Sequence, residues 1–210
     1  MSLFIGSVFA ILVCIYLIFI KEKYASKQYN ILYLSIAVGV AMVLIALIFQ
    51  STLHLIFEPT PFINAFFFAA TIEEVSKYLM IYFLVLKKNI LVNTYDFIKV
   101  ALLASLVFAL IENILYVNVY YKNDGLETAM LRMLSAIPMH ALCGISMGYF
   151  LYIQKIKHFM LVRYLPLIIP ITIHGAYDYF LFVDKPFISF IVLLFFALVH
   201  LKPIKYYFKN

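Results

Sequence analysis

Six side chains that can take up or release protons stand inside apolar stretches of this sequence. They are Glu73, Glu74, Glu112, His140, His174 and Asp178. Carboxylates and imidazoles can activate water, because one group removes a proton while its neighbours stabilise the developing oxyanion. A charged side chain at the centre of a bilayer costs roughly 2.5–3.5 kcal/mol, so such residues usually face the interior of a bundle and have a function. The set therefore predicts hydrolysis carried out within a membrane.

Glu73 and Glu74 are adjacent, so on a helix their side chains point about 100° apart. We therefore expect them to have different roles: either one could activate the water, and Lys77 would neutralise the other. Glu73 precedes Lys77 by four residues, the favourable order for an ion pair. Lys77 is thus either the structural partner of Glu73 or a direct participant, and Asn113 is either a support for the site or a bond between helices.

Helical spacing predicts which faces carry these residues. Ala65 and Ala69 precede Glu73 at steps of four, and Gly144 and Gly148 follow His140 at the same step. Small residues let neighbouring helices approach closely in membranes, so these faces should contact other helices. The glycine pair is expected to serve internal packing rather than dimerisation.

The sixth apolar stretch repeats the step of four with His174 and Asp178. Asp178 can therefore orient an imidazole nitrogen. Pro138, just before His140, is expected to bend the fifth stretch. Arg132 lies near the end of that stretch and is expected to extend its charge toward the membrane surface.

The composition identifies the solvent of these stretches as lipid. The chain has 210 residues, of which 66% are hydrophobic and 12% charged, against roughly 45–50% and 25% in soluble domains. A soluble enzyme, a secreted disulfide scaffold and a disordered tail are excluded. Seven apolar stretches approach the ~20 residues needed to cross a bilayer; they cover roughly 2–20, 31–50, 62–86, 97–120, 128–153, 160–182 and 187–201. We predict an all-α polytopic bundle in one domain, 1–210, with its catalytic helices within about 62–182.

Basic residues alternate between the connectors. Lysines concentrate near 21–30, 87–96 and 154–159 and in the C-terminal tail, whereas the intervening connectors have no such excess. The positive-inside rule then places the N-terminus outside and the C-terminus in the cytoplasm, in the cell membrane. The six proton-exchanging groups fall in the middle to outer half of the bilayer. The same pattern accounts for the net charge of +6, so nucleic acid is not an expected partner.

Four sequence motifs resemble those of the PrsW family of intramembrane proteases, within the superfamily that includes the type II CAAX prenyl endopeptidases. Glu73-Glu74-Val75-Ser76-Lys77 is similar to the family motif E-E-x-x-K, and the segment 108–113 is similar to F-A-x-x-E-N. His140 is similar to the histidine of the third motif, and the segment 174–178 is similar to H-x-x-x-D. They occur in order over 73–178, about half of the chain. The CAAX endopeptidases have His in place of Glu112 and Asn in place of Asp178, so their oxyanion arrangement need not transfer.

The resemblance implies that the six residues form the active site of a peptidase. It further implies a membrane-anchored, single-pass protein substrate, such as an anti-sigma factor, cleaved near the outer face. We favour water activated by a glutamate without an obligatory metal, because the chain has no H-E-x-x-H motif. The alternative is a zinc enzyme with ligands from Glu112, His140, His174 and either Glu74 or Glu73.

Two other functions compete with proteolysis. Carboxylates within membranes also form relays in ion or proton transporters, but here the polar groups stop toward the cytoplasmic side. A non-catalytic membrane scaffold would not need both Glu73 and Glu74. The sequence does not predict the oligomeric state.

Overall fold

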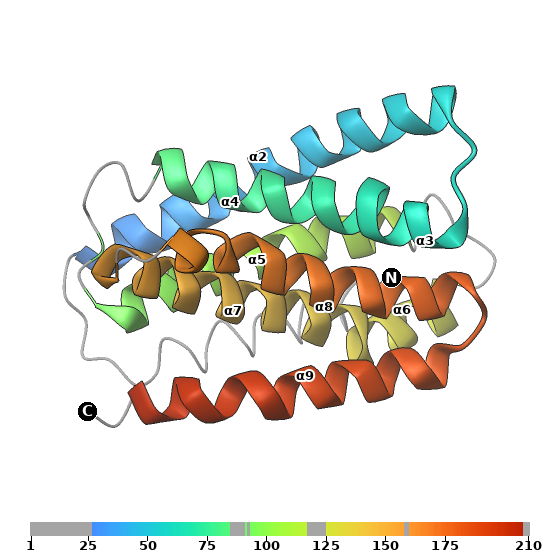
Figure 1. The fold of residues 1–210 in the computed structure, drawn as a ribbon. Helices are drawn as coiled ribbons and strands as arrows, with labels where there is room; N and C mark the ends of the chain where they lie inside the picture. Colours follow the sequence, from blue (N-terminus) through green and yellow to red (C-terminus); the bar gives the residue numbers. More distant parts are fainter. Residues whose placement is uncertain (1–26, 85–90, 92, 117–124, 158–159, 208–210) are drawn as a thin grey trace.

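The computed structural model describes residues 27–84, 91, 93–116, 125–157 and 160–207, and this part of the chain is helical without strands (Figure 1). The elements are α2 (Lys27–Ile56), α3 (Pro61–Ile63), the π-helix η1 (Asn64–Thr71), α4 (Ile72–Leu84), α5 (Thr94–Leu115), α6 (Gly125–Leu134), α7 (Ala136–Ile156), the short 3-10 helix η4 (Met160–Arg163), α8 (Leu165–Phe182) and α9 (Pro186–Tyr207). The predicted all-α class is confirmed. The predicted span at 2–20 lies outside the described residues.

Four of the described helices are long and apolar enough to cross a membrane. They cover Ser35–Ile56, Thr94–Leu115, Ala129–Ile156 and Leu165–Phe182. These ranges correspond to the second, fourth, fifth and sixth predicted spans. The third predicted span is divided among α3, η1 and α4, and the apolar part of α9, Pro186–Val199, is shorter. The count of seven spans and the orientation of the termini stay predictions.

Successive long helices run in opposite directions along the bundle (Figure 1), and α5 packs against both α2 and α7. The contact of α5 with α7 is the most extensive among the described helices. It depends on the predicted glycines, because a Cβ at Gly144 would lie 2.8 Å from the carbonyl oxygen of Ala101, and one at Gly148 would lie 2.5 Å from that of Phe97. The glycine pair therefore packs α7 on α5, which confirms its predicted internal role.

The residues before Glu73 form a π-helix rather than an α-helix. In η1 the residues Ala65 and Ala70, five apart, are fully buried, whereas Ala69 is only partly buried. The hydroxyl of Thr71 donates to the carbonyl oxygen of Phe66, also five residues back, at 2.6 Å. The predicted step of four from Ala65 to Ala69 is therefore wrong, because it assumed α-helical spacing, whereas Ala69 and Glu73 do face one cavity. π-Helical turns are rare and are often found at functional sites.

The fifth predicted span is interrupted just before His140. Helix α6 ends at Leu134 and α7 begins at Ala136, with Ser135 between them at φ −128° and ψ −63°. Pro138 lies in the first turn of α7, where its missing amide hydrogen is tolerated but the preceding helix cannot continue through it. The bend that Pro138 was expected to cause is thus observed as a break of the helix at Ser135. The hydroxyl of Tyr177 donates to Ser135 Oγ across this break at 2.8 Å.

Candidate active site

A cavity of about 660 Å³ is lined by residues of seven elements, α2, η1, α4, α5, α6, α7 and α8. Five of the six predicted site residues line it: Glu73, Glu112, His140, His174 and Asp178. Glu74 lies beside this cavity without lining it, and contacts His174. The structure therefore brings all six side chains together, although they come from four separate helical segments.

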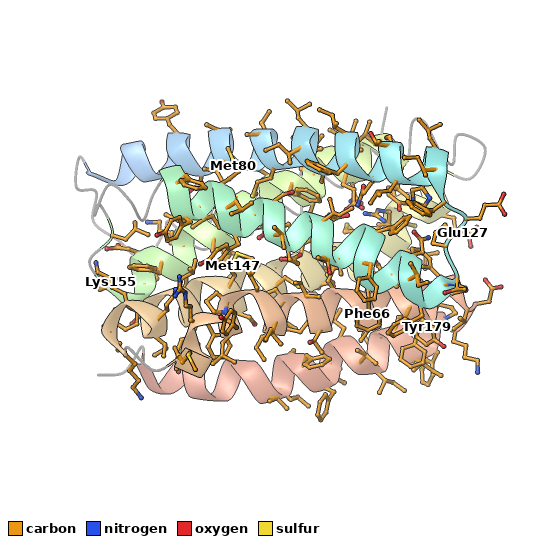
Figure 2. All side chains as sticks on the ribbon, turned by 45° about the horizontal axis from the view of Figure 1, so that its top comes forward. Phe66, Met80, Glu127, Met147, Lys155 and Tyr179 are labelled. Carbon is orange, nitrogen blue, oxygen red and sulfur yellow. The ribbon has the colours of Figure 1, made fainter. Side chains whose placement is uncertain are left out.

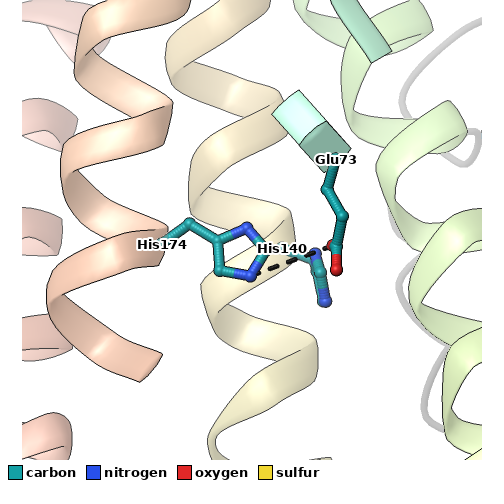
Figure 3. A group of neighbouring side chains, drawn as sticks. All are labelled: Glu73, His140 and His174. Atoms are coloured by element: carbon teal, nitrogen blue, oxygen red, sulfur yellow. Dashed lines mark ion pairs between the residues drawn. The ribbon is translucent and has the colours of Figure 1, made fainter. Parts of the chain in front are cut away.

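Glu73, His140 and His174 form the centre of this group (Figure 3). A carboxylate oxygen of Glu73 and one ring nitrogen from each histidine all lie within 4.8 Å of one another. Glu73 Oε2 is 3.8 Å from His174 Nε2, and the two imidazole rings meet edge to face with centroids 5.1 Å apart. Glu73 Oε2 is buried and has no hydrogen-bond partner among the described residues.

Glu74 has a different environment from Glu73. Its Oε1 lies 2.6 Å from Lys77 Nζ and 3.0 Å from His174 Nδ1, and the side chains of Glu74 and Lys77 are both 0% exposed. Of the two glutamates predicted as possible partners of Lys77, the partner is therefore Glu74 and not Glu73. Glu74 and Lys77 are three residues apart and both point into the bundle, whereas the carboxylate of Glu73 turns toward the cavity and accepts a hydrogen bond from Gln50 at 3.0 Å.

Lys77 also determines the tautomer of His140. Its Nζ lies 3.1 Å from His140 Nδ1, and an ammonium group can only donate hydrogen bonds. We therefore assign the ring hydrogen of a neutral His140 to Nε2, which donates to Glu112 Oε2 at 2.8 Å. Lys77 thus connects Glu74 with His140, and His140 connects this pair with Glu112.

Arg132 belongs to the site, although the sequence was interpreted otherwise. Its Nη2 lies 2.9 Å from Glu112 Oε2, its Nε donates to Asn113 Oδ1, and its guanidinium lies 3.9 Å from the ring centroid of Tyr116. Only 15% of its side chain is exposed. The expectation that Arg132 extends to the membrane surface is therefore wrong. The opposite charges of Glu112 and Arg132, at similar depths in consecutive predicted spans, were the signal that could have paired them.

Asp178 and Gln50 complete the surroundings of the two central groups. Asp178 Oδ2 lies 3.2 Å from His174 Nε2, which agrees with the predicted orienting contact. Gln50 comes from α2, a helix without acidic or basic residues in its middle, and it was not predicted to be a site residue. A long amide in an otherwise apolar stretch was the only available signal.

The residues at the centre fit a metal ion. Glu73, His140 and His174 offer one oxygen and two nitrogens, and three protein ligands leave a position open for a reacting group. The unpartnered Glu73 Oε2 is available for such a bond. The Glu74 carboxylate at His174 Nδ1 resembles the acidic partner that commonly orients a histidine ligand. Of the two glutamates left open as a ligand, Glu73 belongs to this group, whereas Oε1 of Glu74 is held by Lys77 and His174. The predicted ligand Glu112 is not part of the group.

Comparison with known proteins gives one consistent family. Residues 26–201 match the model of the PrsW family of intramembrane metalloproteases. The chain is 34% identical over 180 residues to a protein named Protease PrsW from Oceanobacillus iheyensis, which covers 84% of this chain and 80% of that protein. It is 31% identical to Protease PrsW from Halalkalibacterium halodurans, with 80% and 82% covered, and 25% identical to that of Clostridioides difficile, with 88% and 81% covered. No solved structure matches the chain.

Proposed function

This chain belongs to the PrsW family and is a membrane-embedded peptidase, and from that premise we propose that it hydrolyses a peptide bond of a membrane-anchored, single-pass protein with water activated by Glu73. The observation that carries the proposal is the contrast between the two adjacent glutamates. Each glutamate has one buried oxygen without a hydrogen-bond partner among the described residues, but only Glu73 lines the cavity, where a water molecule can reach it. Glu74 is enclosed and held by Lys77 and His174.

Glu73 is the general base in this proposal. Its Oε2 and the Nε2 of His174, 3.8 Å apart, can share one water molecule. Glu73 takes a proton from that water, the oxygen attacks the carbonyl carbon of the substrate, and the same carboxyl returns the proton to the leaving nitrogen. This cycle leaves Glu73 ionised again after each cleavage.

The surrounding residues hold the reacting groups in place. Glu74 and Asp178 accept hydrogen bonds from the two nitrogens of His174, and Glu112 orients His140. The guanidinium of Arg132 lines the same cavity and supplies positive charge for the tetrahedral oxyanion. Lys77 supports Glu74 and His140 from the side of the bundle core.

The position of the site supports cleavage in the outer half of the membrane. Lys155 lies at one end of the bundle and Glu127 at the other (Figure 2). The cavity is lined by the C-terminal ends of α2, α5 and α8, together with η1 and the start of α7. With lysine-rich ends in the cytoplasm, as the positive-inside rule requires, this site faces the outer half of the cell membrane. An anti-sigma factor with one span has the form of substrate that such a site accepts.

A metal-dependent form of the same peptidase is the second candidate. It is favoured by the three converging donors of Glu73, His140 and His174 and by the metalloprotease description of the family. Zinc bound there supplies Lewis acidity that favours deprotonation of water near neutral pH. The hydrogen bond from His174 Nδ1 to Glu74 is the same in both forms. A ring nitrogen bound to a metal would have no hydrogen to donate, so the metal-dependent form would give up the bond from His174 Nε2 to Asp178, and His140 would give up its contact with Lys77 or with Glu112.

The test starts with vesicles from cells that lack the chain. Purified protein is reconstituted into them, and new N-termini of single-pass proteins are identified by mass spectrometry. We expect cleavage by the wild type and by Glu58→Gln, whose carboxyl is exposed beyond the end of α2, but not by Glu73→Gln or His174→Ala. Each variant must retain a protected Cys143, which is fully buried in the folded chain. Normal cleavage by folded Glu73→Gln and His174→Ala overturns the roles proposed for Glu73 and His174. An absence of cleavage by the wild type overturns the proposed function and favours a scaffold or a transporter.

The same preparation distinguishes the two forms of the peptidase. If Glu73 alone activates water, cleavage persists after dialysis against a strong chelator, and purified protein contains less than stoichiometric metal by mass spectrometry. Loss of cleavage on chelation, restored by Zn²⁺ with one ion bound per chain, establishes the metal-dependent form. In that case, His140→Ala and His174→Ala should each lower the bound zinc.

A further inference from the structure

We infer that Gln50 is a positioning residue that selects which oxygen of Glu73 acts as the base. The inference rests on the proposed function, because it assigns a task to Gln50 only if Glu73 receives a proton. Gln50 lies on α2, outside the segments that carry the four motifs. Its side chain lines the cavity together with that of Glu73.

The two oxygens of Glu73 have unequal surroundings. Gln50 Nε2 donates to Oε1 at 3.0 Å, whereas Oε2 is buried, has no hydrogen-bond partner among the described residues, and faces His174 Nε2 at 3.8 Å. A carboxyl group that is anchored through one oxygen presents the other in a fixed direction. Because the best base has its proton acceptor already aligned with the water, this anchor should act on the chemical step.

Few contacts hold the end of α2 that carries Gln50. Helix α2 is packed into the core at Val38, Met42 and Ala46, but none of residues 47–56 is buried. Beyond Ala46, α2 lines the cavity with Leu47, Gln50, Ser51 and His54, and the His54 ring lies 5.4 Å from that of Phe68. The amide of Gln50 donates the hydrogen bond to Glu73 Oε1 from this end of α2. Loss of the amide should therefore free Glu73 to rotate.

Gln50→Met tests this assignment, because methionine keeps the unbranched length of glutamine and removes its donor. The matched control is Thr52→Val, two residues away on α2, where the hydroxyl donates only to the carbonyl oxygen of Ile48 on its own helix at 2.8 Å. The assay is cleavage of the bond that the wild type cuts and Glu73→Gln does not. We expect kcat to fall by about 10- to 100-fold in Gln50→Met, with KM within twofold of the wild type, and both constants to stay unchanged in Thr52→Val.

An infrared measurement supplies a readout that needs no substrate. The carboxyl band of Glu73 is identified by subtracting the spectrum of Glu73→Gln from that of the wild type. Its frequency should shift in Gln50→Met, because one oxygen loses a hydrogen bond, and should stay in place in Thr52→Val. Protection of Cys143 from thiol reagents checks that each variant is folded, since this side chain is fully buried.

The outcomes separate the inference from the function on which it rests. A folded Gln50→Met with normal kcat, or with an unshifted Glu73 band, overturns the positioning role while the loss of cleavage in Glu73→Gln upholds the peptidase mechanism. A change in KM alone, with kcat unchanged, also overturns the positioning role of Gln50. Normal cleavage by folded Glu73→Gln overturns the proposed function and the role of Gln50 together.

Discussion

Replacement of Lys77 by methionine removes a buried cation from the site while roughly keeping the length of the side chain. In the folded chain, Lys77 Nζ is 2.6 Å from Glu74 Oε1, 3.1 Å from His140 Nδ1 and 4.5 Å from the ring centroid of Phe108. Methionine can occupy the same space but cannot donate a hydrogen bond. Among the described residues, the Glu74 carboxylate then keeps only its contact with His174. The expected result is a large loss of stability.

The magnitude follows from the complete burial of the pair. Removing one partner of a buried ion pair costs about 3–5 kcal/mol, because the remaining charge stays buried without compensation. Replacing both partners by neutral groups is often close to neutral. We therefore expect Lys77→Met to lower the free energy of unfolding by about 3–5 kcal/mol, and the double variant Glu74→Gln/Lys77→Met to recover most of that loss.

The assay uses the buried thiol of Cys143, which is 0% exposed. A Cys14→Ser background leaves Cys143 as the single cysteine of the chain. When refolding is faster than labelling, the labelling rate is proportional to the population of the opened chain. A loss of about 3–5 kcal/mol then raises the rate by roughly 150- to 5,000-fold. Lys155→Met is the control, because Lys155 is exposed and its Nζ donates to the carbonyl oxygen of Leu91.

Two results would refute the reasoning about Lys77. One is a labelling rate for Lys77→Met within a few-fold of the rate for Lys155→Met, which would mean that the ion pair is not buried. The other is a double variant as unstable as Lys77→Met, which would mean that the uncompensated Glu74 charge is not the cause of the loss.

Two further predictions concern the arginine of the site and the orientation of the chain. Arg132→Met should lower cleavage by about 10- to 100-fold, because Glu112 and Asn113 lose charged hydrogen bonds, and Arg132→Lys should recover only part of it because lysine lacks the planar fork; equal activities of wild type and Arg132→Met in a cleavage assay would contradict this role. In the Cys14→Ser background, Glu127→Cys should react with an impermeant maleimide on intact cells, whereas Lys155→Cys should react only after permeabilisation, since these residues lie at opposite ends of the bundle (Figure 2). The opposite labelling pattern would reverse the predicted orientation.

The residue types and their helical spacing were sufficient to predict the helical class and the group of side chains around the cavity. Exposure of Glu112, His140 and His174 to lipid would cost free energy, so each side chain was expected to face the interior of the bundle, whatever the arrangement of the helices. The four-residue step also gave the contact between His174 and Asp178, and the glycines at 144 and 148 gave the packing of α7. These conclusions depend only on local geometry and on the cost of burial.

Features that depend on tertiary packing could not be obtained in this way. The π-helix before Glu73 shifts the helical register of the residues that follow, and no residue type within 64–71 predicts this shift. On α8, the lack of a side chain at Gly175 leaves space for the ring of Phe66. The choice of Glu74 over Glu73 as the partner of Lys77 follows from that register and from the amide of Gln50 on another helix. Arg132 was assigned to the surface because its acidic partner belongs to a different predicted span.

The close approach of Gly148 to the backbone of α5 has a mechanical consequence for the peptidase. Because a Cβ at Gly148 would lie 2.5 Å from the carbonyl oxygen of Phe97, α5 and α7 interlock and cannot slide past each other without separating. Glu112 and His140 are carried on this interlocked pair, so their mutual alignment withstands distortion elsewhere. The C-terminal end of α2 has no buried residue beyond Ala46 and is therefore held less firmly than this pair. A displacement of this end of α2 would leave the geometry of Glu112 and His140 unchanged.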